Sequence, residues 1–197
     1  MRAYLATKNR HKVWEINAIL AATGIVFLPC PEEVVFPEET GTTFEENAFQ
    51  KACFVRGILP EDAFVVAEDS GLCVAALDGL PGVRSARFVS DVCDMPKNIE
   101  KLLVMMERIA APEQRTARFV TVVCLLGPGI REFFRGEKEG VITFSPRGTG
   151  GFGYDPVFEV SGTGKTFAEL APEEKNAVSH RSVAFRNLAD YLMRTVI

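Results

Sequence analysis

Apolar residues occur in short runs along much of the chain, and these runs have the length of β-strands. The strand candidates are residues 3–6, 64–67, 72–77, 115–126, 130–134 and 139–144. The sequence Gly127-Pro128-Gly129 is typical of a turn and predicts that residues 130–134 fold back as a hairpin partner. The sequence therefore predicts several strands, at least two of them antiparallel neighbours.

Between these runs the period changes to three or four residues, which indicates helices. The helix candidates are residues 12–23, 44–56, 95–109 and a final segment from about Ser179. Thr43 is followed three positions later by Glu46, a capping box that predicts where the second helix begins. Strands that alternate with helices predict an α/β fold, and a hairpin within that order predicts a mixed sheet.

Composition limits the class of protein. The 197 residues are 47% hydrophobic, which predicts a single domain over 1–197, or at most two small lobes around a shared core. Acidic residues outnumber basic ones by 26 to 22, so stable nucleic-acid binding is disfavoured. No apolar run approaches the length of about 20 residues that spans a bilayer, and the first residues lack the apolar segment of a secretory signal. We expect a cytoplasmic protein without a membrane partner.

The cysteines favour the same compartment. Their number, five, is odd, and they are spread along the chain without a C-x-x-C pair. We expect them to be small buried side chains in a reducing environment rather than disulfide partners. Neither His11 nor His180 has the spacing from a cysteine that a zinc site requires.

Two polar clusters lie near predicted strand ends. Residues 7–12, T-K-N-R-H-K, lie between the first strand and the first helix, where free amides and basic side chains suit a phosphate. Glu68-Asp69-Ser70-Gly71 is expected at the end of a strand, at the rim of the sheet, and Glu38 and Glu39 lie in a loop upstream. These acids could hold Mg²⁺ or position a water. The alternatives are a simple helix cap and a simple turn.

Two more clusters lie in the last third of the chain. Residues 148–156 contain four glycines, which allow close approach of a ligand, and two aromatic rings, Phe152 and Tyr154, that could stack on a base. Lys175 precedes Ser179-His180-Arg181, expected at the start of the last helix, where they could bind a base edge or a phosphate. The alternatives are a loop anchored by two aromatic rings and an ordinary helix start.

Together these clusters resemble the nucleoside triphosphate pyrophosphatases of the inosine triphosphatase family. The resemblance is carried by ATKNRHKVWE (6–15), EETGTTFEENAFQKA (38–52), AEDSGLCVAALDGLPGVRSARF (67–88), GTGGFGYDPVF (148–158) and TFAELAPEEKNAVSHRSVAFRNL (166–188). It implies an elongated mixed sheet flanked by helices, with two lobes, an active-site cleft between them, and a homodimer.

The resemblance also implies roles for individual residues. Asp69 matches the catalytic base and metal ligand, and Glu38 matches a second Mg²⁺ ligand, with Glu39 a less certain neighbour. The residues expected to bind substrate are Thr7, Lys8, Asn9, Arg10, His11, Lys12, Ser70, Phe152, Gly153, Tyr154, Asp155, Lys175, His180 and Arg181. Four positions depart from the family pattern: Lys8 and His11 replace glycines, Glu68 replaces an aspartate, and Ser182 replaces a glycine.

The implied reaction is Mg²⁺-dependent hydrolysis of ITP, dITP and XTP to the monophosphate and pyrophosphate, which removes non-standard purines from the nucleotide pool. Arg181 is expected to read the 6-oxo edge of the base, where adenine presents a donor instead. Two alternatives stay open at this point. One is a pyrophosphatase acting on dTTP, UTP or modified pyrimidine nucleotides, and the other is a nucleotide-binding module without activity.

Overall fold

The fold was analysed in a computed structural model that describes residues 2–30 and 33–195. The chain forms two compact units. Unit 1 comprises Met1–Asp69, Thr121–Gly136 and His180–Ile197. Unit 2 comprises Ser70–Val120 and Glu137–Ser179.

The strands of the described residues form one six-stranded sheet in the order β2-β1-β3-β4-β5-β6. Strand β1 (Arg2–Leu5) pairs in parallel with both β2 (Val26–Pro29) and β3 (Val65–Val74). At the other edge, β5 (Ile130–Ile142) pairs antiparallel with β6 (Phe158–Val160). The prediction of an α/β fold with a mixed sheet is therefore confirmed.

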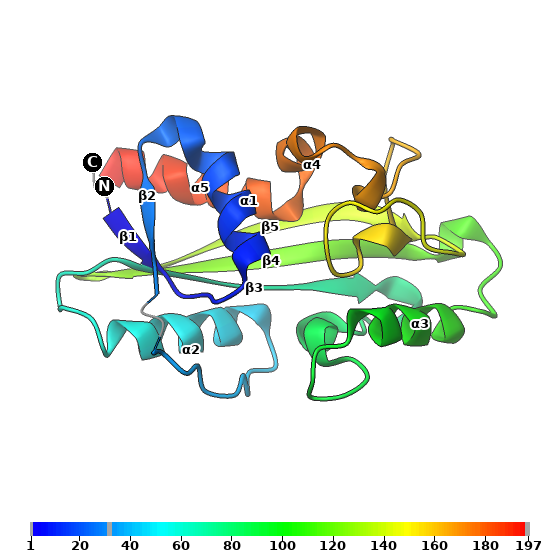
Figure 1. The fold of residues 1–197 in the computed structure, drawn as a ribbon, viewed down its shortest axis with the longest axis horizontal. Helices are drawn as coiled ribbons and strands as arrows, with labels where there is room; N and C mark the ends of the chain where they lie inside the picture. The colour runs from blue at the N-terminus through cyan, green and yellow to red at the C-terminus, as the bar shows by residue number, and fades with distance from the viewer. Residues whose placement is uncertain (1, 31–32, 196–197) are drawn as a thin grey trace. The chain divides into compact units, whose positions relative to one another are not determined.

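Three helices cover the strands of unit 1. Helices α1 (Arg10–Leu20) and α5 (His180–Thr195) lie on one face, and α2 (Phe44–Arg56) lies on the other (Figure 1). The core on the α1 and α5 face joins apolar residues that are far apart in sequence, such as Leu5, Ile16 and Phe185. Helix α2 begins at the predicted capping box, in which Thr43 Oγ1 accepts a hydrogen bond from the amide of Glu46 at 3.1 Å. The first and last helices of the chain thus share one core.

Strand β4 (Thr116–Gly127) is divided between the units, and unit 2 contains its first part together with the end of β3 and the end of β5. Helix α3 (Met95–Met105) lies on one face of its strands and α4 (Pro172–Val178) on the other (Figure 1). Three phenylalanines form the centre of its core: the ring of Phe119 lies 4.7 Å from Phe158 and 5.7 Å from Phe167, between centroids. Short 3₁₀ turns complete both units, at Ala21–Thr23, Ala75–Leu77, Gly82–Arg87, Pro112–Gln114, Asp155–Val157 and Phe167–Glu169.

The structure corrects the predicted ends of two strands. Glu68-Asp69-Ser70-Gly71 does not end a strand, because β3 continues through it to Val74. Buried carboxylates are tolerated within a strand when cations pair with them, as shown below for both acids. Residues 130–134 and 139–144 are not separate strands either, since β5 runs unbroken to Ile142. A strand with one exposed face accommodates the polar residues between them.

Other differences concern short or terminal elements. Strand β2 and helix α4 were not predicted, since four and seven residues are too few for a clear period. Helix α3 ends at Met105, four residues earlier than expected, because Met106 is followed by turns. Among the described residues no helix is long and apolar enough to cross a bilayer.

The cysteines are all free thiols in the described part of the chain. Cys30 and Cys124 are buried as predicted, but the prediction is wrong for Cys53 and Cys93, which are exposed. Burial raises the pKa of the Cys124 thiol to about 12, so that this group stays protonated at neutral pH. Reactivity is therefore expected to differ strongly between these thiols.

We predict that a maleimide at pH 8 labels Cys93 in the folded protein before it labels Cys124. Cys93 reaches solvent, whereas Cys124 is buried within β4 and reacts only after the strand opens. Peptide mass spectrometry after timed quenching measures the order, and a sample unfolded in urea, in which both thiols react, is the control. Equal rates in the folded protein would contradict the burial described here.

Candidate functional site

The first cluster begins where α1 starts. Asn9 caps this helix, and its Oδ1 accepts hydrogen bonds from the amides of His11 at 3.0 Å and Lys12 at 3.3 Å. The hydroxyl of Thr7 accepts from the amide of Asn9 at 3.1 Å. Lys8, Asn9, Arg10 and His11 are exposed, whereas Lys12 turns inward. The predicted phosphate loop is therefore a capped helix start with a rim of exposed basic side chains.

Arg181 lies at the centre of a buried ion network in unit 1. Its Nε donates to both carboxylate oxygens of Glu68, at 3.0 and 3.1 Å, and its Nη1 donates to Glu15 Oε2 at 2.5 Å. The three side chains are almost fully buried. Lys12 Nζ adds a contact of 3.4 Å to Glu68 Oε1. The network joins α1, β3 and α5 through charges that are largely removed from water.

Asp69 belongs to a second group of charges next to the first. Lys51 Nζ on α2 contacts Asp69 Oδ1 at 3.2 Å and Glu39 Oε1 at 2.7 Å, so one ammonium reaches both carboxylates. Asn47 Nδ2 donates to Asp69 Oδ2 at 3.1 Å. Glu39 is therefore part of this cluster, whereas the side chain of its neighbour Glu38 is exposed.

The loop before α2 is fixed to the same asparagine. The amide of Gly41 donates to Asn47 Oδ1 at 2.8 Å, so that Asn47 bonds to the loop and to Asp69 at once. A Cβ at position 41 would lie 2.5 Å from Asn47 Oδ1 and 2.7 Å from Glu46 Cβ, which leaves room only for glycine. Asn47 thus positions both the loop that carries Glu39 and the carboxylate of Asp69.

Burial and neighbouring charges move the pKa values of these groups in different directions. Burial raises the pKa of Asp69, and the Glu39 carboxylate raises it further against the opposing effect of Lys51. Burial alone would also raise the pKa of Glu68, but Arg181 and Lys12 lower it below the ordinary value. Burial lowers the pKa of Lys12, partly offset by Glu68. Of the two buried carboxylates, Asp69 is the stronger base, because its pKa is raised and that of Glu68 is lowered.

The donor set was tested for a divalent cation. Among residues 2–30 and 33–195, no group of three or more His, Cys, Asp or Glu side chains is placed to hold a metal ion by itself. Mg²⁺ in nucleotide enzymes is typically bound by one or two carboxylates together with substrate phosphates. Asp69 and Glu39 already share one positive charge, that of Lys51, so this pair fits Mg²⁺ with a phosphate ligand.

In unit 2 the glycine-rich loop is held by a buried ion pair. Asp155 Oδ2 accepts from Lys175 Nζ at 2.6 Å and from the amide of Phe152 at 2.8 Å. The Lys175 ammonium also lies 4.7 Å from the centroid of the Phe152 ring. Gly151 has a φ of +68°, and a Cβ there would collide with the Asp155 carboxylate. The ammonium of Lys175 thus packs against one face of the half-buried Phe152 ring.

The two aromatic rings of this loop differ in their surroundings. Tyr154 is 2% exposed, and its hydroxyl donates to the carbonyl of Ser85 at 2.9 Å. The sequence prediction that Tyr154 presents a flat face to a base is therefore wrong, because the ring is enclosed in the core of unit 2. Of the two, Phe152 has the ring that a ligand can reach, and Gly153 between them is half-buried.

The remaining predicted residues lie at the end of the chain or in β3. His180 and Ser182 are buried in the first turn of α5, and Ser179 is buried just before it. Ser70 is half-buried in β3. The structure brings Lys12, Asp69, Glu39 and Arg181 into neighbouring contacts of unit 1 and Phe152, Asp155 and Lys175 into contact in unit 2.

Sequence reasoning missed Glu15, Asn47 and Lys51. Lys12 and Glu15 are three positions apart on α1, and Asn47 and Lys51 are four apart on α2, so each pair shares a helix face. On α2 the buried residues Ala48 and Ala52 form an apolar stripe next to that face. A polar pair at helical spacing beside an apolar stripe is the signal that would have found both.

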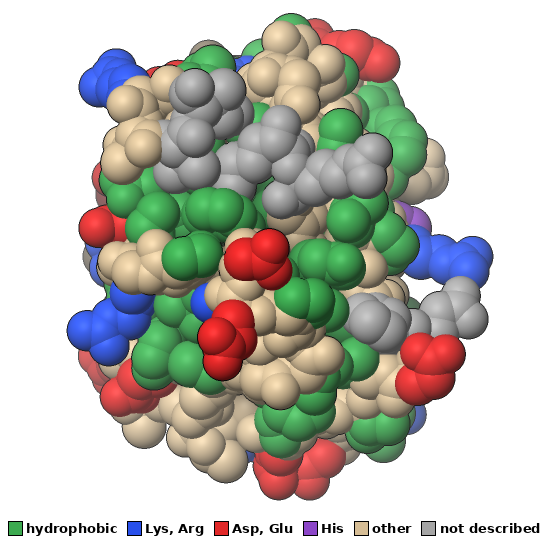
Figure 2. All heavy atoms as spheres, turned by 90° about the vertical axis from the view of Figure 1, so that its left-hand side faces the viewer, with side chains coloured by type: hydrophobic (Ala, Val, Ile, Leu, Met, Phe, Trp, Pro, Cys, Tyr) green, Lys and Arg blue, Asp and Glu red, His purple; other side chains and the backbone are tan. Residues whose placement is uncertain are grey.

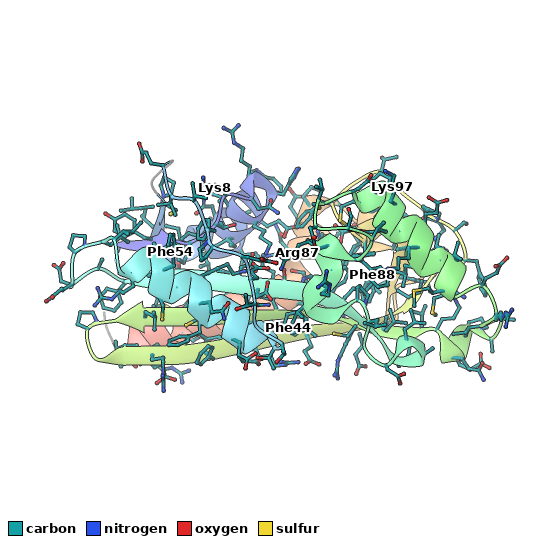
Figure 3. All side chains as sticks on the ribbon, turned by 90° about the horizontal axis from the view of Figure 1, so that it is seen from below. Lys8, Phe44, Phe54, Arg87, Phe88 and Lys97 are labelled. Carbon is teal, nitrogen blue, oxygen red and sulfur yellow. The ribbon has the colours of Figure 1, made fainter. Side chains whose placement is uncertain are left out.

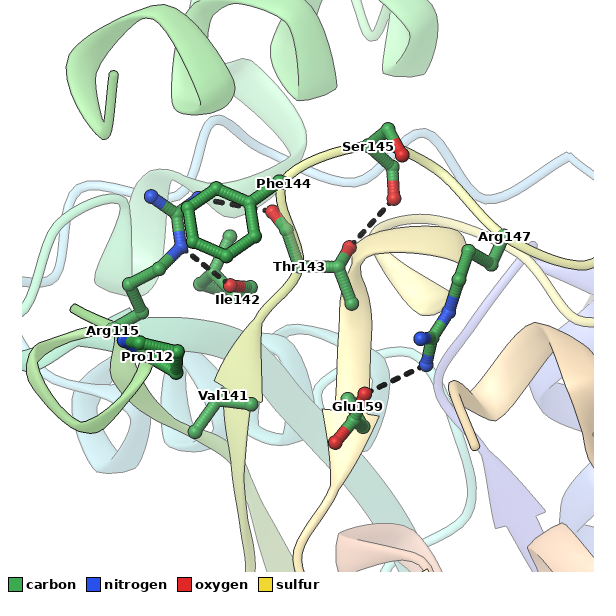
Figure 4. A pocket seen from close by; sticks show the side chains of 9 residues that line it. All are labelled: Pro112, Arg115, Val141, Ile142, Thr143, Phe144, Ser145, Arg147 and Glu159. Atoms are coloured by element: carbon green, nitrogen blue, oxygen red, sulfur yellow. Dashed lines mark hydrogen bonds and ion pairs between the residues drawn. The ribbon is translucent and has the colours of Figure 1, made fainter. Parts of the chain in front are cut away.

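Unit 2 also contains a pocket of about 370 Å³, which is lined by other residues than the predicted site (Figure 4). Phe144 lies over the guanidinium of Arg115, at 4.4 Å, and Arg147 donates to Glu159 at 2.7 Å. Arg115 is buried and donates to four backbone carbonyls, including those of Met106 and Ile109 just after α3. None of the predicted site residues lines this pocket, and Arg115 has a structural role there.

Comparison with solved structures identifies the fold. The Ham1 protein of Staphylococcus aureus superposes with a TM-score of 0.86 at 35% identity, covering 98% of this chain and 99% of that one. A HAM1 protein from Coxiella burnetii gives a TM-score of 0.87 at 37% identity, covering 99% and 100%. The α/β architecture with this mixed sheet is therefore that of the Ham1 proteins.

Sequence comparison agrees. The model of the Ham1 family matches residues 3–191, and the chain belongs to this family. A protein of Geobacter sulfurreducens named dITP/XTP pyrophosphatase is 48% identical over 194 residues, 97% of this chain and 96% of that protein. One of the same name from Symbiobacterium thermophilum is 46% identical over 192 residues, 97% and 94%. These findings confirm the resemblance inferred from the sequence.

We predict that Arg181→Met destabilises the protein by about 3–5 kcal/mol, because it removes the guanidinium that pairs with the buried carboxylates of Glu15 and Glu68 and leaves Glu68 with the longer Lys12 contact. Urea unfolding followed by circular dichroism measures the change. Arg194→Met, at an exposed position of the same helix, is the matched control and should stay within about 0.5 kcal/mol. Equal effects of the two substitutions would show that the network adds little.

Proposed function

We propose that this chain hydrolyses dITP, XTP and ITP to the nucleoside monophosphate and pyrophosphate. The observation that carries the proposal is the Asp69 cluster, a buried carboxylate held by Asn47 and Lys51, in a chain 48% identical to a protein named dITP/XTP pyrophosphatase. Relatives with this name support a purine substrate, and the pyrimidine alternative has no such support. A binding module without activity would not need a carboxylate with a raised pKa among cations.

In the proposed reaction a water is the nucleophile. The water attacks the α-phosphorus while Asp69 accepts a proton from it. The bond between the α-phosphorus and the bridging oxygen breaks, and pyrophosphate leaves with the bridging oxygen. Asn47 fixes the orientation of the Asp69 carboxylate, which places the base before the substrate arrives. The raised pKa makes Asp69 a stronger base than an exposed aspartate.

Cations of unit 1 are proposed to bind the triphosphate. Lys12 and Lys51 are held in place by Glu68 and by Asp69, respectively, so their ammonium groups need little reorganisation. Lys8, Arg10 and His11 are exposed on the same loop and extend the positive rim. Thr7 and Asn9 are proposed to contribute by fixing the start of α1, whose dipole favours an anion.

Mg²⁺ is the proposed cofactor, with Asp69 and Glu39 as its protein ligands. When bound, it would offset phosphate charge and hold the phosphate oxygens in a fixed orientation. Glu39 is preferred over the predicted Glu38 because it shares Lys51 with Asp69, whereas Glu38 is exposed. Neutralisation of the two carboxylates would also release Lys51 to pair with phosphate.

The base is proposed to stack on Phe152, whose opposite face is held by Lys175. The prediction that Arg181 reads the 6-oxo edge stays a prediction. Its Nε and Nη1 already donate to Glu68 and Glu15, so a hydrogen bond from either atom to a base would break a buried ion pair. Ser70 and His180 keep their predicted roles as substrate contacts.

A homodimer is proposed as the assembly. Hydrophobic side chains gather on the face drawn in Figure 2, with acidic side chains among them. Exposed apolar residues of unit 1 include Val26, Ile58 and Met193, and covering such residues is a common basis of self-association. Light scattering after size exclusion measures the mass in solution.

The cytoplasmic location expected from the sequence stays a prediction.

We predict that the purified protein releases pyrophosphate from dITP, XTP and ITP much faster than from dATP or dTTP. Asp69→Asn should lower kcat about 10²- to 10⁴-fold, since it removes the proposed base. Asp62→Asn, at an exposed position, is the matched control and should behave like the wild type. Wild-type turnover by the Asp69 variant would exclude this carboxylate as the base, and equal rates on dTTP would restore the pyrimidine alternative.

We predict that Glu39→Gln raises the Mg²⁺ concentration needed for half-maximal activity by about 10-fold or more, because a ligand loses its charge. Glu38→Gln, one residue away, should leave this concentration unchanged. Initial rates across a Mg²⁺ titration at fixed dITP measure both variants. The reverse pattern would return the ligand role to Glu38.

A further inference from the structure

Behind the glycine-rich loop, one buried asparagine of unit 2 binds three backbone positions. Asn98 on α3 is 1% exposed; its Oδ1 accepts from the amide of Val89 at 2.9 Å, and its Nδ2 donates to the carbonyl of Ala86 at 3.0 Å. The carbonyl of Ser85 lies 3.4 Å from the same Nδ2. Asn98 therefore fixes the segment Gly82–Val89 against α3. Figure 3 labels Arg87 and Phe88 of this segment and Lys97 of α3.

The same segment is bonded to the glycine-rich loop. The carbonyl of Ser85 accepts from the Tyr154 hydroxyl at 2.9 Å. The Ser85 hydroxyl in turn accepts from the amide of Leu72 at 2.9 Å and donates to the carbonyl of Gly82 at 2.7 Å. Tyr154, Ser85 and Asn98 thus form one buried chain of hydrogen bonds from the loop to α3.

Met95, in the first turn of α3, lies between Asn98 and the glycine-rich loop. Its Sδ is 3.7 Å from Asn98 Nδ2. A Cβ added at Gly153 would lie 3.9 Å from Met95 Cε, so the loop next to Phe152 faces the start of α3.

We propose that Asn98 and Tyr154 are positioning residues for the nucleotide base, acting through Ser85. They hold the backbone next to Phe152, so that the ring is in place before a base stacks on it. This inference rests on the proposed function, in which Phe152 contacts the base. Neither residue touches the phosphates or Asp69 in this proposal, so their loss should weaken binding and leave the chemical step largely intact.

The test uses Tyr154→Phe, which removes only the hydroxyl, and Asn98→Ala. Each should raise KM for dITP on the order of tenfold, the effect of losing one or two buried hydrogen bonds, with kcat within about twofold of the wild type. Ile99→Ala, next to Asn98 on the same helix, is the control for lost packing and should leave KM unchanged. A fall in kcat at constant KM would overturn the proposal, as would wild-type KM values in both variants.

The double variant adds a second readout. Tyr154 and Asn98 act through one segment, so their effects on KM should be less than multiplicative, whereas Tyr154→Phe combined with Ile99→Ala should have the KM of Tyr154→Phe alone. Fully independent effects of Tyr154 and Asn98 would contradict a common path.

Hydrogen exchange tests the positioning without any activity. Amides of residues 148–154 should exchange faster in Tyr154→Phe and Asn98→Ala than in the wild type or Ile99→Ala. Unchanged exchange in both variants would overturn the inference. If the wild type hydrolysed neither dITP nor XTP, the proposed function would fail, and exchange would still decide whether the loop depends on these residues.

Discussion

The buried guanidinium of Arg181 is the constraint on which unit 1 depends. It comes from the last helix and pairs with Glu15 of the first helix and Glu68 of β3, so it joins both ends of the chain to the sheet. Charges removed from water are tolerated only when each has its partner, and loss of one leaves the others uncompensated. Lys12 contacts Glu68, and Asp69 follows Glu68 directly in β3. The arrangement that stabilises the fold therefore also fixes the groups proposed to act on the nucleotide.

Unit 2 also contains a buried ion pair, with fewer charged groups than the network of unit 1. Asp155 holds Lys175 and the amide of Phe152 with a single oxygen, and Lys175 lies against the Phe152 ring. In both units a buried carboxylate orients a lysine, so the lysine is placed without a substrate. Such preorganisation lowers the cost of ordering side chains when an anion binds. The glycines and aromatic rings of the loop would not hold it in one conformation without the Asp155–Lys175 ion pair.

Local patterns in the sequence predicted much of the fold. The capping box at Thr43 located the start of α2, and the apolar run of β4 was correct to within one residue. The polar residues within β3 led to the wrong prediction that the strand ends before Glu68. Carboxylates in a buried strand need cationic partners, and here these partners lie far away in the sequence. Arg181 and Glu68 are separated by 113 positions, and no local pattern reports such a pair. Tyr154 was misassigned for the same reason, since the carbonyl that binds it belongs to Ser85.

The net charge of −4 is compatible with a polyanionic substrate because the relevant charges are arranged locally. Lys51 is held between Asp69 and Glu39, and Lys12 is held by Glu68, so the carboxylates keep cations oriented that would otherwise point into water. In the proposed function, an arriving phosphate would compete with these carboxylates for the two ammonium groups. A divalent cation bound by Asp69 and Glu39 would shift this competition toward phosphate. Binding of metal and nucleotide would then favour each other through Lys51, without any change in the fold.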